Sequence, residues 1–141
     1  MTYLLDTCIL SKLRKISKSK DQILQEWVVK HVEEQYFLSV LTIGEIQQGI
    51  SKLKDDKQKR ILEDWLNEVL FRFESRILPI DSRVAAKWGD LSGASLKRGL
   101  PQPVIDCLIA STAIVHDLTL VTENIKDFAQ NDELKIFNPW E

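Results

Sequence analysis

The chain has 141 residues, 44% hydrophobic and 28% charged, which favours one globular domain with a proper core and argues against intrinsic disorder. No apolar run approaches the ~20 residues of a membrane span, and the N-terminus lacks the layout of a secretory signal, so we expect no membrane association. The net charge of −2 gives no overall attraction to nucleic acid, so such a partner would need a local basic surface.

Short apolar runs alternate with segments of helical periodicity, which predicts a parallel sheet covered by helices. The first strand, Tyr3–Leu5, is followed by a helix that begins near Cys8. Asp21 is expected to cap a second helix, and Tyr36–Ser39 forms the next strand. The remaining predicted elements are a helix over 41–53, a long amphipathic helix over 61–73, a strand over 76–80, a helix capped by Asp81 and closed by Gly99, a central apolar helix over 104–116, a strand over 118–122 and an edge strand over 134–137.

Four acidic residues fall where this topology brings distant segments together. In an open parallel sheet, ligands bind beyond the carboxyl ends of the strands. Asp6 ends the first strand, and Glu45 lies in the first turn of the helix after the second strand. Asp106 lies in the first turn of the apolar helix, and Asp127 follows the fourth strand by a few residues. We therefore expect the four carboxylates to meet at one edge of the sheet.

Each acid also has an ordinary structural explanation. Asp6 could cap the helix that follows it. The stretch from Thr42 to Glu45, "TIGE", fits a capping box. Asp106 could be a favourable acid at a helix N-terminus, and Asp127 could be a turn residue. A shared site explains all four with one cause, and it is the interpretation we favour.

Carboxylates so close together would repel one another and raise one another's pKa values unless a cation compensates them. An all-oxygen donor set suits a hard ion such as Mg²⁺ or Mn²⁺, which keeps several waters and usually binds phosphate oxygens as well. Cys8 and Cys107 follow close behind two of the acids and are interpreted as small buried residues. Such an ion beside a phosphate would support hydrolysis of a phosphodiester by a metal-activated water.

The stretches "LLDTCILSKL", "FLSVLTIGEIQQGI" and "GLPQPVIDCLIASTAIVHDLTLVTENIKDF" resemble the motifs of PIN-domain ribonucleases, in particular toxins of the VapC/FitB type. The resemblance runs from Met1 to about Phe137. Some members have an acid at the position of Asn124, so the fourth ligand could be Asp127, Asn124 or a water held by either. The matching positions are the acids Asp6, Glu45, Asp106 and Asp127 and the neighbouring Thr7, Thr122 and Asn124.

The resemblance implies a single PIN-like domain over residues 1–141, with three α/β/α layers around a central, mostly parallel sheet of four to five strands. It also implies a Mg²⁺- or Mn²⁺-dependent endoribonuclease, the toxin of a type II toxin–antitoxin system. Its partners would be an RNA substrate, a cognate antitoxin and a second copy of the chain in a homodimer. The two cysteines are too few for a disulfide framework and indicate a reducing cytoplasm. A non-catalytic PIN-like binding module with a structural Mg²⁺ site is the alternative.

Basic residues near the acids are candidates for contacts with RNA phosphates, although a solvated helix face would also explain them. The segment "KLRKISKSK" supplies Lys12, Arg14 and Lys15 just after the first acid. Arg98 precedes Asp106, and Lys126 adjoins Asp127. Few aromatic residues are near these charges in the sequence, so base stacking is not indicated.

Overall fold

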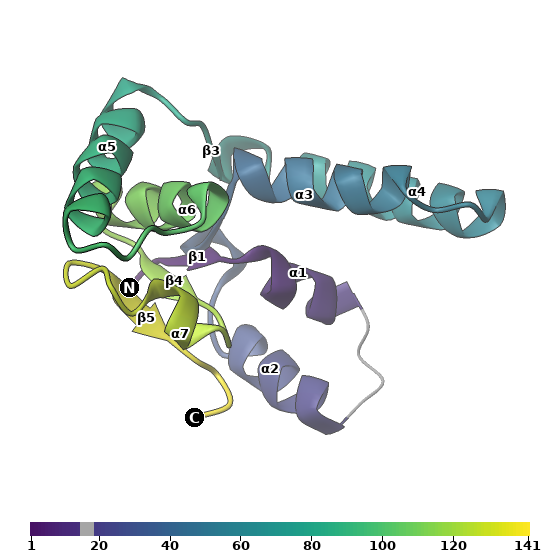
Figure 1. Cartoon of the computed structure of the whole chain (residues 1–141). Helices are drawn as coiled ribbons and strands as arrows, with labels where there is room; N and C mark the ends of the chain where they lie inside the picture. The colour runs from purple at the N-terminus through teal and green to yellow at the C-terminus, as the bar shows by residue number, and fades with distance from the viewer. Residues whose placement is uncertain (15–18) are drawn as a thin grey trace.

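The structure is a computed structural model that describes residues 1–14 and 19–141. Its five strands are all parallel and form one sheet in the order β3–β2–β1–β4–β5. This confirms the expected parallel sheet of four to five strands, with the last strand at an edge (Figure 1). The strands are β1 (Tyr3–Leu5), β2 (Tyr36–Ser39), β3 (Ile77–Leu78), β4 (Thr119–Val121) and β5 (Lys135–Phe137).

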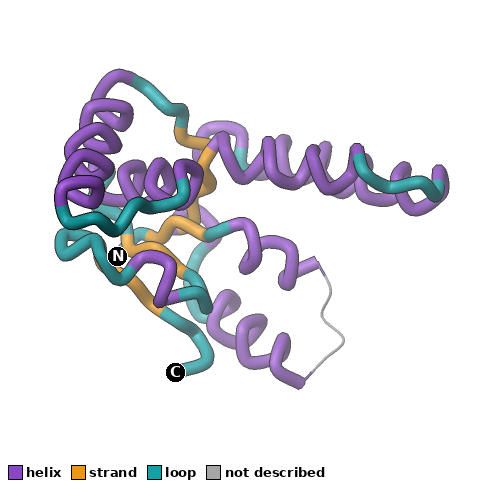
Figure 2. Tube along the Cα trace, in the orientation of Figure 1, coloured by secondary structure: helices purple, strands orange, loops and turns teal. Residues whose placement is uncertain are grey.

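Seven α-helices connect and cover the strands in the described part of the chain, and Figure 2 shows the strands between them. The helices α3 and α4 form a long pair that extends away from the sheet, while α1 and α2 lie beside each other (Figure 1). None of the described helices is both long and apolar enough to cross a membrane. The helices are α1 (Thr7–Arg14), α2 (Ser19–Val29), α3 (Val40–Ser51), α4 (Asp56–Arg72), α5 (Ser82–Lys97), α6 (Val104–Val115) and α7 (Ile125–Phe128).

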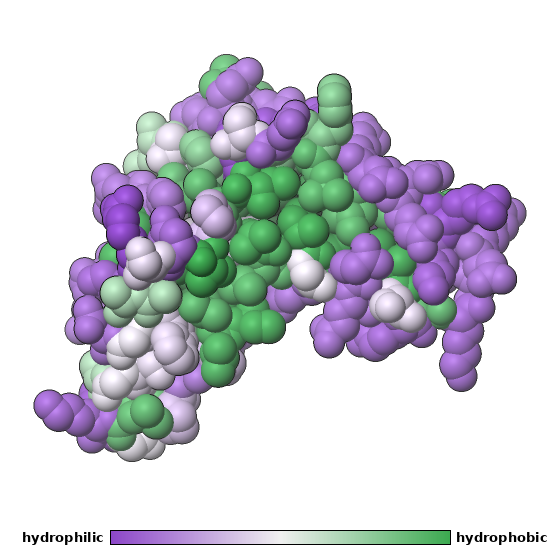
Figure 3. Space-filling model, turned by 90° about the horizontal axis from the view of Figure 1, so that it is seen from above, coloured by the Kyte–Doolittle hydropathy of each residue, from purple (hydrophilic) through white to green (hydrophobic). Residues whose placement is uncertain are grey.

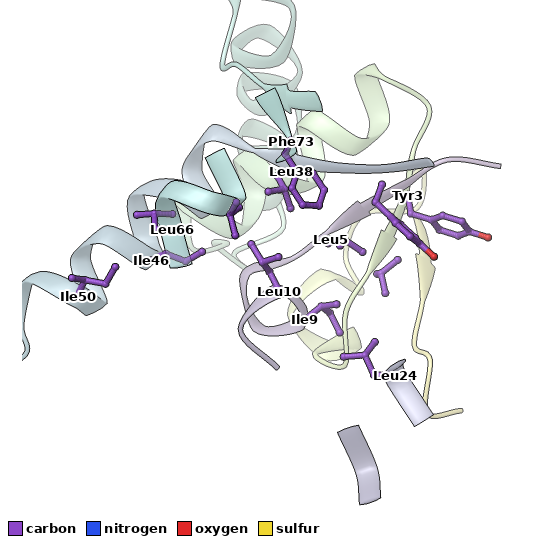
Figure 4. Packing of buried hydrophobic residues seen from close by; sticks show 13 residues of the cluster. Tyr3, Leu5, Ile9, Leu10, Leu24, Leu38, Ile46, Ile50, Leu66 and Phe73 are labelled. Carbon is purple, nitrogen blue, oxygen red and sulfur yellow. The ribbon is translucent and has the colours of Figure 1, made fainter. Parts of the chain in front are cut away.

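The alternation of side chains along β1 divides the core into two parts. Tyr3 and Leu5 point into one buried cluster, whereas Leu4 points into another, as the two-residue period of a strand requires. The first cluster contains residues of α1, α2, α3 and α4 (Figure 4), and the second contains residues of α6 and α7. The sheet is therefore the middle layer of the expected α/β/α arrangement.

Local capping explains where several helices begin and end. Asp55 accepts hydrogen bonds from the first turn of α4, and Asp81 accepts one from the backbone N–H of Val84 at 3.0 Å, which confirms the predicted cap of α5. Gly99 has a φ of 72°, a conformation that glycine adopts without a Cβ penalty, so the predicted end of α5 at this glycine is also confirmed.

The predicted cap of α2 is wrong, and the capping box that was the alternative explanation for Glu45 is absent. Asp21 lies inside the first turn of α2, because that helix already begins at Ser19. Thr42 does not begin α3, because Ser39 is the cap and its hydroxyl oxygen accepts from the backbone N–H of Leu41 at 3.1 Å. Glu45 therefore does not belong to the capping box that "TIGE" suggested.

Two boundaries also differ from the sequence prediction, and one helix was missed. The long helix α4 begins at Asp56 rather than near residue 61, and β3 contains two residues rather than five. The short helix α7 was not predicted. The apolar helix α6 packs centrally as expected, with Ala110 and Ala113 fully buried, but Val104 and Ile105 in its first turn are exposed.

Candidate active site

Asp6 is buried at the point where β1 ends and α1 begins. Its Oδ1 accepts a hydrogen bond from the backbone N–H of Ile9 at 2.9 Å, and its Oδ2 accepts one from the hydroxyl of Thr122 at 2.5 Å. The first contact is the capping role that the sequence allowed, and the second ties β1 to the end of β4. Both carboxylate oxygens are therefore held in place, with only 6% of the residue exposed.

Glu45 lies in the second turn of α3, one turn later than we expected. Its Oε1 accepts a hydrogen bond from the hydroxyl of Thr7 at 2.6 Å. The hydroxyl of Thr7 is also 3.1 Å from that of Thr42, which is fully buried. Thr7 thus links the start of α1 to α3 and orients the Glu45 carboxylate.

Asp106 lies in the first turn of α6, as predicted, and is half-buried. Burial raises the pKa of Asp106, and the negative charges of Asp127 and Glu45 raise it further. Asp127 itself is an exposed residue of α7. Asp106 therefore carries a carboxylate whose ionised form is disfavoured by two other acids.

The pKa of Asp6 is also raised, first by burial. The hydrogen bonds from Thr122 and Ile9 lower this pKa, while the charges of Glu123 and Glu45 raise it. Glu45 thus acts electrostatically on both Asp6 and Asp106. The carboxyl edge of the sheet collects acids from four separate segments, and their mutual repulsion is not compensated by the hydrogen bonds alone.

The donor chemistry of this edge fits a hard divalent cation. Its carboxylates supply oxygen ligands, and a bound positive charge would remove the repulsion. Among residues 1–14 and 19–141, however, no three His, Cys, Asp or Glu side chains are arranged so that they could hold a metal ion together. Mg²⁺ usually retains several waters and needs only one or two carboxylates, so this arrangement remains compatible with such an ion.

The segment after β4 faces the start of α1. Thr122 is fully buried, and its hydroxyl oxygen accepts from the backbone N–H of Asn124 at 3.0 Å. The Asn124 side-chain amide is 3.7 Å from the sulfur of Cys8. Cys8 is exposed, so our expectation that it would be buried is wrong, whereas Cys107 is buried as expected.

The candidate RNA-binding residues have different surroundings. Lys12 pairs with Glu123, and the Arg14 guanidinium lies 5.7 Å from the ring centroid of Trp65. Arg98 donates to Gln130 at 3.2 Å and to Ser95 at 3.4 Å, and Lys126 is exposed. Lys15 lies outside the described residues.

Sequence reasoning missed three residues beside these charges: Glu123, Trp65 and Trp140, whose ring centroid is 5.0 Å from the Lys12 ammonium. Glu123 stands next to Thr122 in "TENIKDF" and could have been recognised as a further acid of the site. Trp65 is distant in sequence, and only the packing of α4 against α1 brings it to Arg14. The expectation that few aromatic residues accompany the basic residues therefore does not hold in three dimensions.

A groove of about 770 Å³ begins at this edge and runs between α1, α3 and α4. Thr7 and Glu45 line its end at the acids, together with Lys12. Farther along, its lining becomes more apolar and includes Ile50, Leu53, Leu62 and Trp65. A ligand in this groove would contact the acidic edge and a partly apolar surface at the same time.

The structure has a parallel sheet between two helical layers. Acids from several segments lie at the carboxyl edge of this sheet. The model of the PIN domain matches residues 3–134, so the chain belongs to the PIN-domain family. It is 31% identical over 138 residues to the toxin FitB of Neisseria gonorrhoeae, an alignment that covers 97% of each protein.

Two further comparisons agree with this assignment. The VapC ribonuclease Y4jK of Sinorhizobium fredii is 30% identical over 138 residues, which cover 97% of this chain and 96% of the relative. The crystal structure of FitAcB from Neisseria gonorrhoeae matches with a TM-score of 0.89 at 30% identity, covering 99% of both chains. The resemblance to the PIN family and the α/β/α arrangement are both confirmed.

Proposed function

We propose that this protein is a divalent-metal-dependent endoribonuclease that acts as the toxin of a type II toxin–antitoxin pair. The observation that carries the proposal is the electrostatics of the acidic edge, where burial and neighbouring acids raise the pKa values of both Asp6 and Asp106. Such a cluster is unfavourable without a cation, and functional sites are where such arrangements are kept. Membership of the PIN family and similarity to a VapC ribonuclease support the same activity.

The chain's own residues would hold and orient the ion, Mg²⁺ or Mn²⁺. Thr122 and the N–H of Ile9 fix Asp6, and Thr7 fixes Glu45, so these carboxylates lose little freedom when they bind. When bound, the ion would polarise the phosphoryl group and lower the pKa of the attacking water. Asn124 is the alternative to Asp127 as the fourth ligand. The proposed catalytic and metal-binding residues are Asp6, Glu45, Asp106 and Asp127. One or two of these carboxylates would contact the ion directly, and the others would bind it through its retained waters.

RNA would approach this edge through phosphate contacts with nearby basic residues. Arg14 lines the groove that begins at Thr7 and Glu45, so it is well placed to contact RNA beyond the cleaved bond. Lys126 is exposed next to Asp127. Arg98, which hydrogen-bonds to Gln130, and Lys15 are the remaining candidates.

An antitoxin and a second copy of the chain are the proposed protein partners. The similarity to a toxin supports the first, and an antitoxin segment in the groove between α1, α3 and α4 would inhibit by excluding RNA. For the homodimer, hydrophobic residues gather across the centre of the face seen in Figure 3, and broad exposed apolar areas commonly mark interfaces. Both cysteines are free, which fits a reducing cytoplasm.

The test is to incubate the purified protein with a mixed RNA pool in the presence of Mg²⁺, Mn²⁺ or EDTA. We expect endonucleolytic cuts with 5′-phosphate and 3′-hydroxyl ends that depend on the ion and are absent in Asp6→Asn and Asp106→Asn. Both substitutions keep the side-chain shape, so the variants should remain folded by circular dichroism. Equal cutting by wild type and variants would indicate a contaminating nuclease and remove the proposal.

The same variants separate the enzyme from the non-catalytic binding module with a structural Mg²⁺ site. In that module, metal would still raise the melting temperature, but wild type would cut no RNA with any ion. An active enzyme would cut RNA with Mg²⁺ or Mn²⁺, would stop cutting in EDTA, and would lose this activity in Asp6→Asn and Asp106→Asn while remaining folded.

A further inference from the structure

Three contacts join Asp6 and the helix that follows it, α1, to residues 122–124, the segment after β4. Thr122 donates to the Asp6 carboxylate at 2.5 Å, and the Asn124 amide lies 3.7 Å from the Cys8 sulfur. The third contact is an ion pair in which Lys12 Nζ lies 2.5 Å from Glu123 Oε1. We call these three contacts the α1–β4 clasp. The clasp begins at Asp6 and ends at Lys12. Loss of the Lys12 contact would therefore let residues 122–124 move and would disturb the hydrogen bond between Thr122 and Asp6.

Lys12 is enclosed more than a typical surface lysine. Its side chain is 30% exposed, and that of Glu123 is 23% exposed. The Lys12 ammonium also lies 5.0 Å from the ring centroid of Trp140, near the C-terminus. An ion pair that is partly shielded from water and stacked against an aromatic ring holds its geometry better than an exposed pair does.

Glu123 adds a negative charge to an edge that must admit a polyanion. Its charge is one of those that act on Asp6 and also on Cys8. If Glu123 were not neutralised, it would repel an approaching RNA phosphate, since steering of charged ligands depends on the local field. The positive charge of Lys12 lies directly on this carboxylate and offsets it.

We propose that Lys12 is a positioning residue of the acidic site, rather than a contact for RNA phosphates. Its ion pair with Glu123 keeps residues 122–124 against α1, so that the Thr122 hydroxyl stays hydrogen-bonded to Asp6. Its positive charge also reduces the repulsion between Glu123 and the substrate. The inference about catalysis rests on the proposed ribonuclease function. It revises the expectation that Lys12 binds RNA, because its ammonium already contacts Glu123 and Trp140.

Four variants test the two parts of this role separately: Lys12→Met, Glu123→Gln, the double variant Lys12→Met/Glu123→Gln, and the exchanged pair Lys12→Glu/Glu123→Lys. Lys57→Met, on an exposed residue of α4, controls for the loss of one surface charge. The measurements are kcat and KM for a single-stranded RNA that wild type cuts, its binding by fluorescence anisotropy at several salt concentrations, and the melting temperature of each variant.

We expect kcat to fall in every variant that lacks the ion pair between positions 12 and 123. We expect KM to rise only in the variant that keeps Glu123 and loses the positive charge of Lys12. Lys12→Met and Glu123→Gln should each lower kcat about tenfold, because a small displacement of a positioned group has effects of this size or larger. Only Lys12→Met should also raise KM and weaken anisotropy binding. In the double variant KM should return to the wild-type value while kcat stays low, and the exchanged pair should recover both.

A direct contact with RNA predicts a different pattern. KM would then be raised in all three variants that lack Lys12, most in the exchanged pair, and Glu123→Gln would leave kcat unchanged. That pattern overturns the proposal, as does an exchanged pair whose kcat remains at the level of the single variants. A purely structural pair would change melting temperatures but neither kinetic constant, which also overturns it.

The failure of the ribonuclease proposal would be visible separately. If wild type cuts no RNA with any ion, that proposal falls. The inference about Lys12 is then decided by anisotropy binding and melting temperature, which need no turnover. If the exchanged pair recovers both RNA binding and melting temperature, the role of the Lys12–Glu123 ion pair is supported. If either measurement fails to recover, the inference about Lys12 falls.

Discussion

The two ends of β1 differ in how well their polar groups are satisfied. At its start, Tyr3 packs edge-on against Trp27 with ring centroids 5.0 Å apart, and its ring lies 5.9 Å from that of Tyr36. Both tyrosine hydroxyls here have hydrogen-bond partners. The Tyr36 hydroxyl donates to the carbonyl of Val28 at 2.8 Å, and the Tyr3 hydroxyl lies 3.4 Å from Nε2 of His31. This aromatic end combines large buried area with completed hydrogen bonds.

At the other end of the strand, three residues later, Asp6 lies among acids whose negative charges repel one another. Burial raises the pKa values of Asp6 and Asp106, and Glu45 adds to both shifts. One short strand thus connects a region that stabilises the fold with a region whose acidic charges destabilise it. Substitutions at the two ends should therefore have opposite effects on stability.

The largest effect is expected at the aromatic end. Trp27→Ala should lower the free energy of unfolding by about 3 kcal/mol, because it removes a large side chain that contacts Tyr3, His31, Tyr36 and Phe137. Urea denaturation measures this change. Phe71→Ala, at a residue that is 79% exposed, is the matched control and should change stability by less than about 0.5 kcal/mol. Similar losses in both variants would contradict the assigned role of the aromatic end.

The next effect is a gain of stability from metal at the acidic end. A ligand that binds only the folded state at ten times its Kd stabilises that state by about 1.4 kcal/mol. Titration of wild type with Mg²⁺ or Mn²⁺ should therefore raise its melting temperature in a saturable manner. Asp106→Asn should shift the response to higher metal concentration. The same rise in both proteins would mean that the ion binds somewhere other than this edge.

The sequence predicted the sheet and most elements well, because apolar runs and caps such as Asp81 are local signals. The four acids could also be proposed from the sequence as candidates for one site, since parallel strands bring their carboxyl ends to one edge. The contacts that fix them could not. Thr7 reaches Glu45 and Thr122 reaches Asp6 across 38 and 116 residues of sequence, respectively. The same holds for Lys12 and Glu123, 111 residues apart, which sequence reasoning treated as unrelated.

A smaller loss is expected from Tyr36→Phe, which removes one hydrogen bond to Val28 and leaves the ring. The free energy of unfolding should fall by about 1 kcal/mol, the usual value for such a bond. Burial, together with Tyr3, raises the pKa of Tyr36 from 10.0 to about 12. Because the folded state resists ionisation, wild type should lose stability as the pH rises above 10, and the Phe variant should lack this loss. Parallel pH profiles above pH 10 would show that the hydroxyl is not held as described.

The smallest effect, and the one with opposite sign, is expected from Asp106→Asn in metal-free buffer. At pH 7 the ionised Asp106 is destabilising, because burial, Asp127 and Glu45 raise its pKa above the ordinary 3.8. The variant should therefore be more stable than wild type, by less than about 1 kcal/mol because solvent screens a half-exposed carboxyl. As the pH falls through the raised pKa toward 3.8, the folded wild type binds its proton before the unfolded chain does, so the difference should shrink. Thermal melts of both proteins between pH 7 and pH 3.5 measure this. A constant difference, or a less stable variant at pH 7, would show that the acids do not repel one another at this edge, and the contrast between the two ends of β1 would then fail.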